Sequence, residues 1–259
     1  MTENSPKAIH LAAGQGTRLR PITNDRPKPL VELGDKSLLE RNVETLRAVG
    51  IDDQLSITGY RADQIRKLGY DTVHNPIYDE TEMVYSLFCA EDYFPENRDL
   101  FISYGDIIYE KQVVELLLEC TAPLCVVVDY AWEELWEQRF DDPLDDAETL
   151  QIDDDGRIRE IGSEPEDIED IEGQYIGLLK IRDDHVEEFT EVYRDLSNDG
   201  SDAVEMTHFV QHLIDTGWDV QSVPIEGNWL EVDTIADLEF YQEQLEKKKA
   251  ISHVSWIDN

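Results

Sequence analysis

The feature that most constrains the fold of this chain is a glycine-rich turn directly after a short apolar run near the N-terminus. Residues 7–12 form the apolar run, and Gly14 and Gly16 follow it at once. An apolar run that stops at glycine predicts a buried strand that leads into a loop at its carboxyl end. Open α/β sheets bind their ligands at that edge, so we expect a ligand site there.

Two cations follow the glycines in the sequence. Gly14 and Gly16 let the backbone approach a ligand closely and turn its N–H groups toward anionic oxygens. Arg18 and Lys28 add positive charge that glycine cannot supply. This combination is typical of phosphate binding, and a triphosphate would match these donors.

Two familiar glycine-rich motifs do not match this turn. The Walker motif requires glycine, lysine and a hydroxyl residue in succession, and Gln15, Gly16 and Thr17 follow Gly14 instead. The dinucleotide fingerprint needs a third glycine where Leu19 stands. The pattern therefore disfavours a P-loop NTPase and a dinucleotide-dependent oxidoreductase.

Strand and helix patterns alternate through the first half of the chain and then shorten between residues 131 and 182. Alternation of this kind predicts an α/β fold, with a Rossmann-like, mainly parallel sheet flanked by helices and a small α+β insertion. In chain order, we expect strands at residues 7–12, 54–58, 71–74, 99–104, 123–130, 174–181 and 218–224. The expected helices are residues 37–49, with Ser37 as the cap, 62–68, 83–91, 111–120, 201–216 and 235–249.

The segment from Leu11 to Leu30, with its glycines and cations, resembles the nucleotidyltransferases that include the sugar-nucleotide pyrophosphorylases and the phosphocholine cytidylyltransferases. The resemblance runs from about residue 7 to about residue 245 and implies a glycosyltransferase-A-like nucleotidyltransferase fold. It implies an enzyme of class EC 2.7.7, which transfers a nucleotidyl group from a nucleoside triphosphate to a phosphorylated acceptor and releases pyrophosphate. Members hold Mg²⁺ with two aspartates, for which the candidates are Asp106 and Asp233, each directly after a short apolar run.

Three further stretches look like the phosphocholine cytidylyltransferase branch. They are residues 75–87, residues 132–148 and the segment from Gly227 to Asp233. This likeness implies CTP as the donor and a phosphocholine-like phosphoalcohol or an aminoalkylphosphonate as the acceptor. A sugar 1-phosphate stays open as the alternative acceptor. We expect one domain over residues 1–259, with a nucleotide-binding half at 7–130, an acceptor-binding half at 131–233 and a C-terminal helix and tail at 234–259.

The resemblance also implies roles for single residues. Arg18 would grip the leaving phosphates, and Lys28 would neutralise charge near the α-phosphate or the acceptor phosphate, so these are the candidate catalytic residues. The candidates for nucleotide binding are Leu11, Ala12, Ala13, Gly14, Gly16, Thr17, Arg18 and Ser86. Aromatic faces beside carboxylates can hold an ammonium group, and the candidates at the acceptor are Tyr130, Trp132, Trp136, Tyr175 and Trp229.

Each of these candidates has a structural alternative. Asp106 could form a turn, Asp233 could cap the following helix, and the aromatic residues could simply pack in the core. A catalytically silent nucleotide-binding or regulatory domain of the same fold stays open as a second class of function. His208 and His212 lie four residues apart on a predicted helix, but we expect them to be structural because no partner carboxylate can be named.

The composition is strongly acidic. The chain has 59 acidic and 22 basic residues, which gives a formal charge of −37 at pH 7. Repulsion of this size falls when salt shortens the Debye length from about 10 Å at 0.1 M to about 3 Å at 1 M, so the composition is of the haloarchaeal type and indicates a high-salt cytoplasm. The charge disfavours nucleic acid and anionic membranes as partners. The acidic runs, such as 153–155 and 164–170, are expected at solvated edges and turns.

The N-terminal residues and the cysteines give the remaining expectations. Residues 1–6 lack the basic start and apolar core of a secretory signal, and no apolar run approaches the roughly 18 residues of a membrane span. We therefore expect a cytoplasmic protein, with its oligomeric state open and a homo-oligomer allowed. Cys89, Cys120 and Cys125 form no metal-type pair and stand in apolar contexts, so we expect buried thiols.

Overall fold

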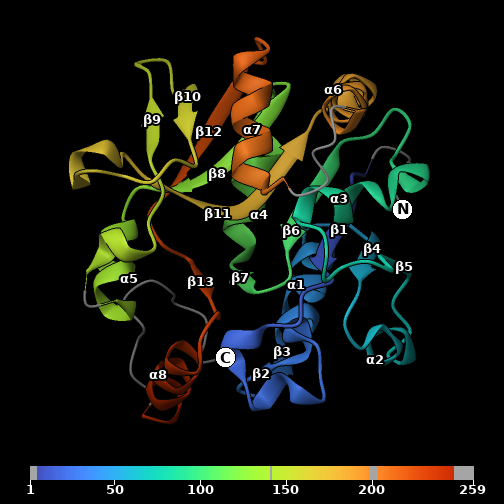
Figure 1. The fold of residues 1–259 in the computed structure, drawn as a ribbon, viewed down its shortest axis with the longest axis vertical. Coiled ribbons are helices and arrows are strands. Elements are labelled where there is room, and N and C mark those ends of the chain that lie inside the picture. The colour runs from blue at the N-terminus through green and yellow to red at the C-terminus, as the bar shows by residue number, and fades with distance from the viewer. Residues whose placement is uncertain (1–4, 141, 199–203, 248–259) are drawn as a thin grey trace.

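The structure is a computed structural model that describes residues 5–140, 142–198 and 204–247 (Figure 1). The helices are α1 (Leu38–Ala48), α2 (Ala62–Lys67), α3 (Met83–Phe88), α4 (Lys111–Glu119), α5 (Trp132–Arg139), α6 (Val186–Asn198), α7 (Met206–Asp215) and α8 (Ile235–Glu246). The strands are β1 (Lys7–Ala12), β2 (Glu32–Leu33), β3 (Lys36–Ser37), β4 (Asp53–Thr58), β5 (Thr72–His74), β6 (Leu100–Tyr104), β7 (Ile107–Tyr109), β8 (Leu124–Asp129), β9 (Leu150–Ile152), β10 (Ile158–Ile161), β11 (Gln174–Ile181), β12 (Val220–Ile225) and β13 (Trp229–Glu231).

The main sheet has seven strands in the order β12-β8-β11-β6-β1-β4-β5. All neighbouring pairs are parallel except those of β11, which runs antiparallel to both β6 and β8. The prediction of an α/β fold with a mainly parallel sheet is therefore confirmed. The reversed strand follows the excursion of residues 131–173, which returns the chain to the middle of the sheet.

Both faces of the sheet are buried, because alternate side chains of each strand enter different cores. On β1, Ala8 packs into the core beneath α1 and α4, whereas Ile9 packs into the core beneath α3, α6 and α7. In Figure 1, α7 lies across the sheet, with α6 beside it near the upper end. Helices thus cover both faces and leave the carboxyl ends of the parallel strands at one edge.

Local sequence signals explain the first helix well. The hydroxyl of Ser37 accepts a hydrogen bond from the backbone N–H of Glu40 at 3.2 Å, so Ser37 is the N-cap as predicted. Leu39, Val43 and Leu46 recur at helical spacing and are buried. A glycine in the left-handed region, Gly50 with φ +85°, follows the helix.

The second half differs more from the expectation. Helices α5 and α6 were not predicted, although their apolar residues recur at helical spacing. On α6, Val186, Phe189 and Tyr193 are buried at spacings of one turn. The predicted helix at 201–216 begins at Met206, and its residues 201–203 lie outside the described residues, as do residues 248–249 of the last predicted helix.

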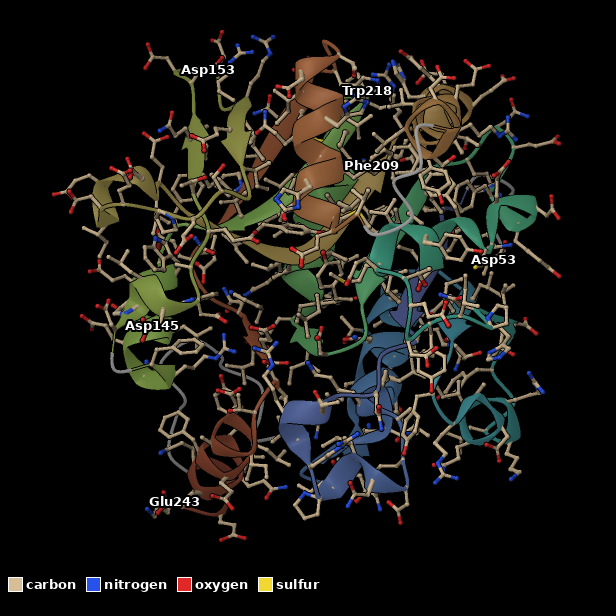
Figure 2. All side chains as sticks on the ribbon, viewed as in Figure 1. Asp53, Asp145, Asp153, Phe209, Trp218 and Glu243 are labelled. Carbon is tan, nitrogen blue, oxygen red and sulfur yellow. A yellow bond between two sulfur atoms is a disulfide. The ribbon has the colours of Figure 1, made fainter. Side chains whose placement is uncertain are left out.

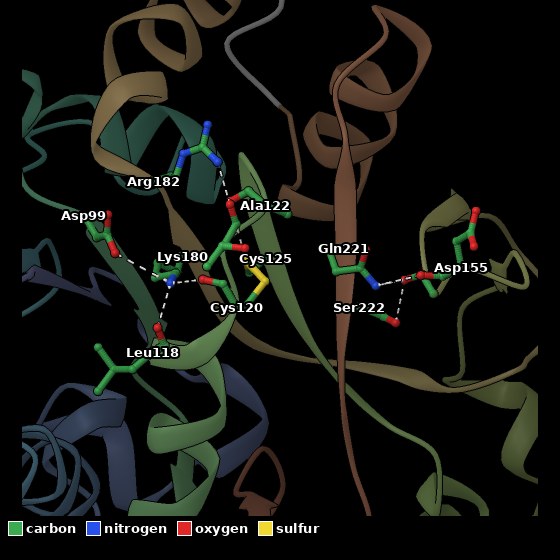
Figure 3. Close-up of a disulfide and its surroundings, with 12 residues drawn as sticks. Asp99, Leu118, Cys120, Ala122, Cys125, Asp155, Lys180, Arg182, Gln221 and Ser222 are labelled. Carbon is green, nitrogen blue, oxygen red and sulfur yellow. Dashed lines mark hydrogen bonds and ion pairs between the residues drawn. A yellow bond between two sulfur atoms is a disulfide. The ribbon is translucent and has the colours of Figure 1, made fainter.

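The prediction of buried thiols is wrong, because two of the three cysteines form a disulfide and the third is only half-buried. Cys120 ends α4 and Cys125 lies in β8, and the two form a disulfide with a Cα–Cα distance of 6.3 Å (Figure 3). The turn between them brings the two backbones within disulfide range, which sequence spacing alone does not show. Beside the disulfide, Lys180 donates a hydrogen bond to the carbonyl of Cys120 at 2.5 Å. Cys89 has a free, half-buried thiol.

The acidic side chains gather on the outside of the molecule. Asp145, Asp153 and Glu243 lie at its periphery in Figure 2. Asp153 stabilises the turn between β9 and β10 by accepting hydrogen bonds from the backbone N–H groups of Asp155 and Arg157, each at 2.9 Å. The acidic runs thus form turns of folded structure in the described residues.

Candidate active site

Four charged side chains meet near the carboxyl ends of β1 and β6. The ammonium of Lys28 lies 2.7 Å from Asp106 Oδ2 and 2.5 Å from Asp233 Oδ1. The guanidinium of Arg18 lies 2.7 Å from Asp233 Oδ2. The structure therefore brings together the four residues for which the family resemblance implies catalytic and metal-binding roles; we call them the charged cluster.

Short structural elements hold the two aspartates side by side. Asp106 stands between β6 and β7, and Asp233 follows β13, which pairs antiparallel with β7. The backbone N–H of Val232 donates to the carbonyl of Asp106 at 2.9 Å, which extends this pairing to the aspartates. The two-stranded ladder thus carries Asp233 to the edge where β6 delivers Asp106.

The beginning of α8 fixes the backbone of Asp233. Thr234, not Asp233, is the N-cap, and it forms a capping box with Asp237. One oxygen of Asp237 accepts hydrogen bonds from the N–H groups of Asp233 at 3.1 Å and Thr234 at 2.8 Å. The alternative of Asp233 as a helix cap is therefore wrong, and its carboxylate faces the two cations.

Lys28 is buried, with 8% of its surface exposed, and it stays charged. Burial by itself lowers the pKa of Lys28, but the carboxylates of Asp106, Asp233 and Glu231 outweigh that effect and hold the pKa above its ordinary value. A buried ammonium between two carboxylates marks a position built to hold a cation.

The two aspartates fit the ligand chemistry of Mg²⁺. Asp106 Oδ1 is buried and has no hydrogen-bond partner among the described residues, so one carboxylate oxygen stays available to a ligand. Mg²⁺ is commonly bound by one or two carboxylates together with water and phosphate oxygens. No group of three or more histidine, cysteine, aspartate or glutamate side chains within residues 5–140, 142–198 and 204–247 could hold a metal, which includes His208 and His212.

The glycine turn packs directly against the charged cluster. Gly16 has φ +67°, and a Cβ placed on it would lie 2.8 Å from Cβ of Lys28. A side chain at Gly16 would therefore displace the lysine as well as strain the backbone. A Cβ on Gly14 would meet nothing within 4 Å, which leaves space beside that backbone for a ligand.

A cleft opens between the glycine turn and α3, and we call it the first cleft. Of the predicted nucleotide-binding residues, Leu11, Ala13, Gly14 and Ser86 line it, together with Lys28 and Asp106. Ala12 is buried beneath it, whereas Gly16, Thr17 and Arg18 are not part of its lining.

A second cleft adjoins the first through the shared residues Met83 and Tyr104, and we call it the acidic cleft. Three of the aromatic residues predicted at the acceptor line it, namely Trp136, Tyr175 and Trp229. Its acidic lining residues are Asp146, Glu148, Glu205 and Glu231, and no lysine or arginine lines it. Burial and the nearby Glu205 raise the pKa of Glu148, so this cleft favours a cationic ligand.

Two residues predicted at the acceptor do not line the acidic cleft. Trp132 is buried and packs edge-on against Trp136 with the ring centroids 5.8 Å apart, so it supports the acidic cleft from behind. Tyr130 directly follows β8 and lines a separate groove with Leu116 and Asn228. The strand end turns its ring away from the acidic cleft, so the structure does not place Tyr130 at the acceptor position.

Sequence reasoning missed several residues of these clefts. Asp146 and Glu231 stand in acidic surroundings that resemble solvated surface, and Tyr104 was seen only as part of a strand. The signal that could have found Tyr104 is its place at the end of β6, two residues before Asp106. Within the described residues, no helix is long and apolar enough to cross a membrane.

Comparison with known proteins gives one family and several relatives. The model of the MobA-like NTP transferase domain matches residues 8–162. A CTP:phosphoglutamine cytidylyltransferase of Campylobacter jejuni is 39% identical over 255 residues, which cover 93% of this chain and 99% of the relative. A choline-phosphate cytidylyltransferase of Streptococcus pneumoniae is 42% identical over 90 residues, which cover 33% of this chain and 39% of the relative.

Solved structures share the fold. The structure of the inositol-1-phosphate CTP transferase from T. maritima superposes with a TM-score of 0.72 at 23% identity, and the match covers 95% of this chain and 98% of that chain. At this identity the likeness shows the fold alone. It matches the sheet and helices described above.

Proposed function

We propose, since the chain belongs to the MobA-like NTP transferase domain family and is a nucleotidyltransferase, that it transfers CMP from CTP to a small phosphorylated acceptor in a Mg²⁺-dependent reaction. The family is typically metal-dependent. The observation that carries the proposal is the buried ammonium of Lys28 between the carboxylates of Asp106 and Asp233. A catalytically silent nucleotide-binding domain would not require a buried lysine and two aspartates at one edge of the sheet.

The reaction in this proposal is an in-line displacement at the α-phosphorus of CTP. An oxygen of the acceptor phosphate forms a new bond to that phosphorus, and the bond to the bridging oxygen of the leaving pyrophosphate breaks. The acceptor oxygen is already anionic, so the protein needs no nucleophile of its own. Positioning and charge stabilisation supply the catalysis in reactions of this kind.

The charged cluster supplies that stabilisation. Lys28 faces the α-phosphate or the acceptor phosphate from the first cleft, and Arg18 reaches the leaving phosphates from its partly exposed position above Asp233. Asp106 and Asp233 would hold Mg²⁺, which when bound neutralises phosphate charge. The metal would supply positive charge to these carboxylates, and the ammonium of Lys28 would then be available to a phosphate oxygen.

Two features support CTP and a cationic acceptor. The relatives named as cytidylyltransferases include one that the chain matches over nearly its whole length. The acidic cleft adjoins the first cleft and is lined by carboxylates together with tryptophan and tyrosine side chains, which suits an acceptor with an ammonium group. Phosphoglutamine and phosphocholine both carry a cationic nitrogen and are the first acceptors to test.

A pyrophosphate-release assay tests this proposal. The purified chain would be incubated in about 1 M KCl with Mg²⁺, each of the four nucleoside triphosphates, and phosphoglutamine, phosphocholine, phosphoethanolamine, 2-aminoethylphosphonate or a sugar 1-phosphate. We expect release with CTP and one of the cationic acceptors. Release only with a sugar 1-phosphate would contradict the acceptor class, and no release with any pair would contradict the enzymatic function.

A further inference from the structure

Arg139, the last residue of α5, is buried where the acidic cleft meets the charged cluster. Its side chain is 2% exposed. One terminal nitrogen lies 2.7 Å from a carboxylate oxygen of Glu231, and Nε donates to Asp237 Oδ1 at 3.1 Å. Its guanidinium carbon lies 5.3 Å from the centroid of the Trp136 ring. Arg139 therefore contacts two residues of the acidic cleft and one residue of α8.

Asp237 links Arg139 to the backbone of Asp233. Its Oδ1 accepts from Arg139, while its Oδ2 accepts the N–H groups of Asp233 and Thr234. Asp237 is 4% exposed, so water competes little for these bonds. A shift of Arg139 would move this carboxylate and, with it, the segment that presents Asp233.

The chemistry of this position requires an arginine. Burial by itself lowers the pKa of Arg139, but Glu231 and Asp237 outweigh that effect, so the group stays cationic. The two carboxylates come from different elements, β13 and α8. A planar guanidinium can pair with both while it stacks on Trp136, whereas a lysine ammonium is a single point of charge.

We propose that Arg139 is a positioning residue that holds the acceptor side and the metal side of the site in one frame. It fixes the backbone of Asp233 through Asp237. It also holds Trp136 and Glu231 in the wall of the acidic cleft. This inference rests on the proposed function, because it takes Asp233 as a metal ligand and the acidic cleft as the acceptor site.

Hydrogen exchange gives a direct readout that does not depend on turnover. The N–H groups of Asp233 and Thr234 are bonded to the carboxylate that Arg139 orients. We expect the peptide that contains them to exchange faster in Arg139→Lys than in the unmodified chain, while peptides from the middle of α8 keep their rate. Asp237→Asn is a second variant, because the single acceptor oxygen of an amide cannot serve the capping box and the guanidinium at the same time.

Steady-state kinetics give the second readout. A displaced Asp233 lowers kcat by about tenfold to a hundredfold, because small errors of position are costly at a reacting centre. We expect the KM for CTP to stay within about twofold, since neither Arg139 nor Asp237 lines the first cleft. The double variant should lose no more than the worse single variant, because both act through one contact. Arg98→Lys is the matched control, since Arg98 pairs with Asp53 at 2.8 Å far from the site.

Failure of the proposed role of Arg139 can be distinguished from failure of the proposed function. Unchanged exchange at Asp233 and Thr234 in Arg139→Lys, or faster exchange with an unchanged kcat, overturns the role of Arg139. A rise in the KM for CTP as large as the loss of kcat also overturns it, because that result indicates general unfolding of the site. Absence of pyrophosphate release from the unmodified chain contradicts the proposed function instead.

Discussion

The ammonium of Lys28 lies 2.5 Å from Oδ1 of Asp233, although 205 residues separate the two along the chain. Lys28 leaves the glycine turn in a short 3-10 helix, Lys28–Leu30, and Asp233 arrives by the β7–β13 ladder. The contact therefore closes the site between the two ends of the fold. It also places a protein cation between the two carboxylates that we propose as Mg²⁺ ligands.

This relationship leads to a prediction about Lys28→Met. Removing the ammonium leaves the buried carboxylate of Asp233 and the half-buried carboxylate of Asp106 close together without it, which should lower the free energy of unfolding by about 3 kcal/mol in the absence of metal. Mg²⁺ should then raise the Tm of Lys28→Met more than that of the unmodified chain, because it replaces the lost charge. Thermal unfolding with and without Mg²⁺ measures both effects.

The control for Lys28 is Lys36→Met. Lys36 pairs with Glu44 on the exposed surface, so its loss should change neither Tm nor the response to Mg²⁺. Absence of any rise in the Tm of Lys28→Met on addition of Mg²⁺ would contradict binding of the metal by the two carboxylates. Activity of Lys28→Met should also fall, by about 100-fold or more in kcat, because a cation at the reacting phosphate is lost.

A second prediction concerns the glycine turn. Gly16→Ala and Gly50→Ala both place alanine at a positive φ, and each should cost about 1–2 kcal/mol of stability for that reason. Only Gly16→Ala also forces a Cβ against Lys28, whereas a Cβ on Gly50 meets nothing within 4 Å. Gly16→Ala should therefore be the less stable variant in urea unfolding and should lose activity. Equal stability and equal activity of the two variants would contradict the predicted contact between a Cβ at position 16 and Lys28.

A third prediction concerns pH and the buried His10. Nε2 of His10 donates to Gln54 Oε1 at 2.9 Å, because the amide nitrogen of Gln54 is already used as a donor, and Nδ1 has no partner among the described residues. Burial lowers the pKa of His10 to about 4, although its hydrogen bond to Gln54 has the opposite, smaller effect. Protonation would place an unpaired N–H in the core.

The direction in which stability changes with pH follows from proton uptake by the unfolded chain. Between pH 6.5 and pH 4 the unfolded histidine binds a proton that the folded one does not, so stability falls as pH falls through this window. The loss from His10 alone should reach about 3 kcal/mol at pH 4. The free energy of unfolding of His10→Gln, measured in urea, should depend less steeply on pH than that of the unmodified chain. His208→Gln serves as the exposed control. Parallel pH profiles for all three proteins would refute the assignment.

A fourth prediction concerns the acceptor. Trp136→Ala should raise the KM for the acceptor about tenfold, because a cation–π contact and part of the wall of the acidic cleft are lost. The KM for CTP should hardly change, since Trp136 does not line the first cleft. Trp218→Ala is the control, because Trp218 packs on Phe189, away from both clefts. Equal rises in both KM values would count against the acidic cleft as the acceptor site.

The elements around the glycine turn could be predicted because their signals are local. A buried strand, two glycines, a capping serine and an apolar helix face each show in a few residues, and β1, α1 and β6 lie where we expected them. Asp106 and Asp233 were found because each follows an apolar run. Their meeting was expected only from the family resemblance, since the β7–β13 ladder is too short to show a period.

The features that could not be predicted depend on contacts between residues that are distant in the sequence or on how a turn folds. In the sequence, Arg139 resembles an ordinary surface cation, and Glu231 resembles one of many surface carboxylates. Only the folded structure shows that Arg139 pairs with Glu231 and with Asp237 of α8. In a chain of charge −37, acidic residues of the site do not stand out from the others. The Cys120–Cys125 disulfide likewise depends on how the turn after α4 folds.

The most direct test of nucleotidyl transfer follows the α-phosphate of the nucleotide. The chain would be incubated with Mg²⁺, CTP labelled at the α-phosphorus and the acceptor identified by pyrophosphate release, beside Asp233→Asn as the matched variant. We expect the label in a new cytidine diphosphate ester of the acceptor, formed in equal amount to pyrophosphate, and a loss of about 100-fold or more in Asp233→Asn. Label that appears only as CMP, or stays in CTP with every acceptor, would contradict transfer at this site.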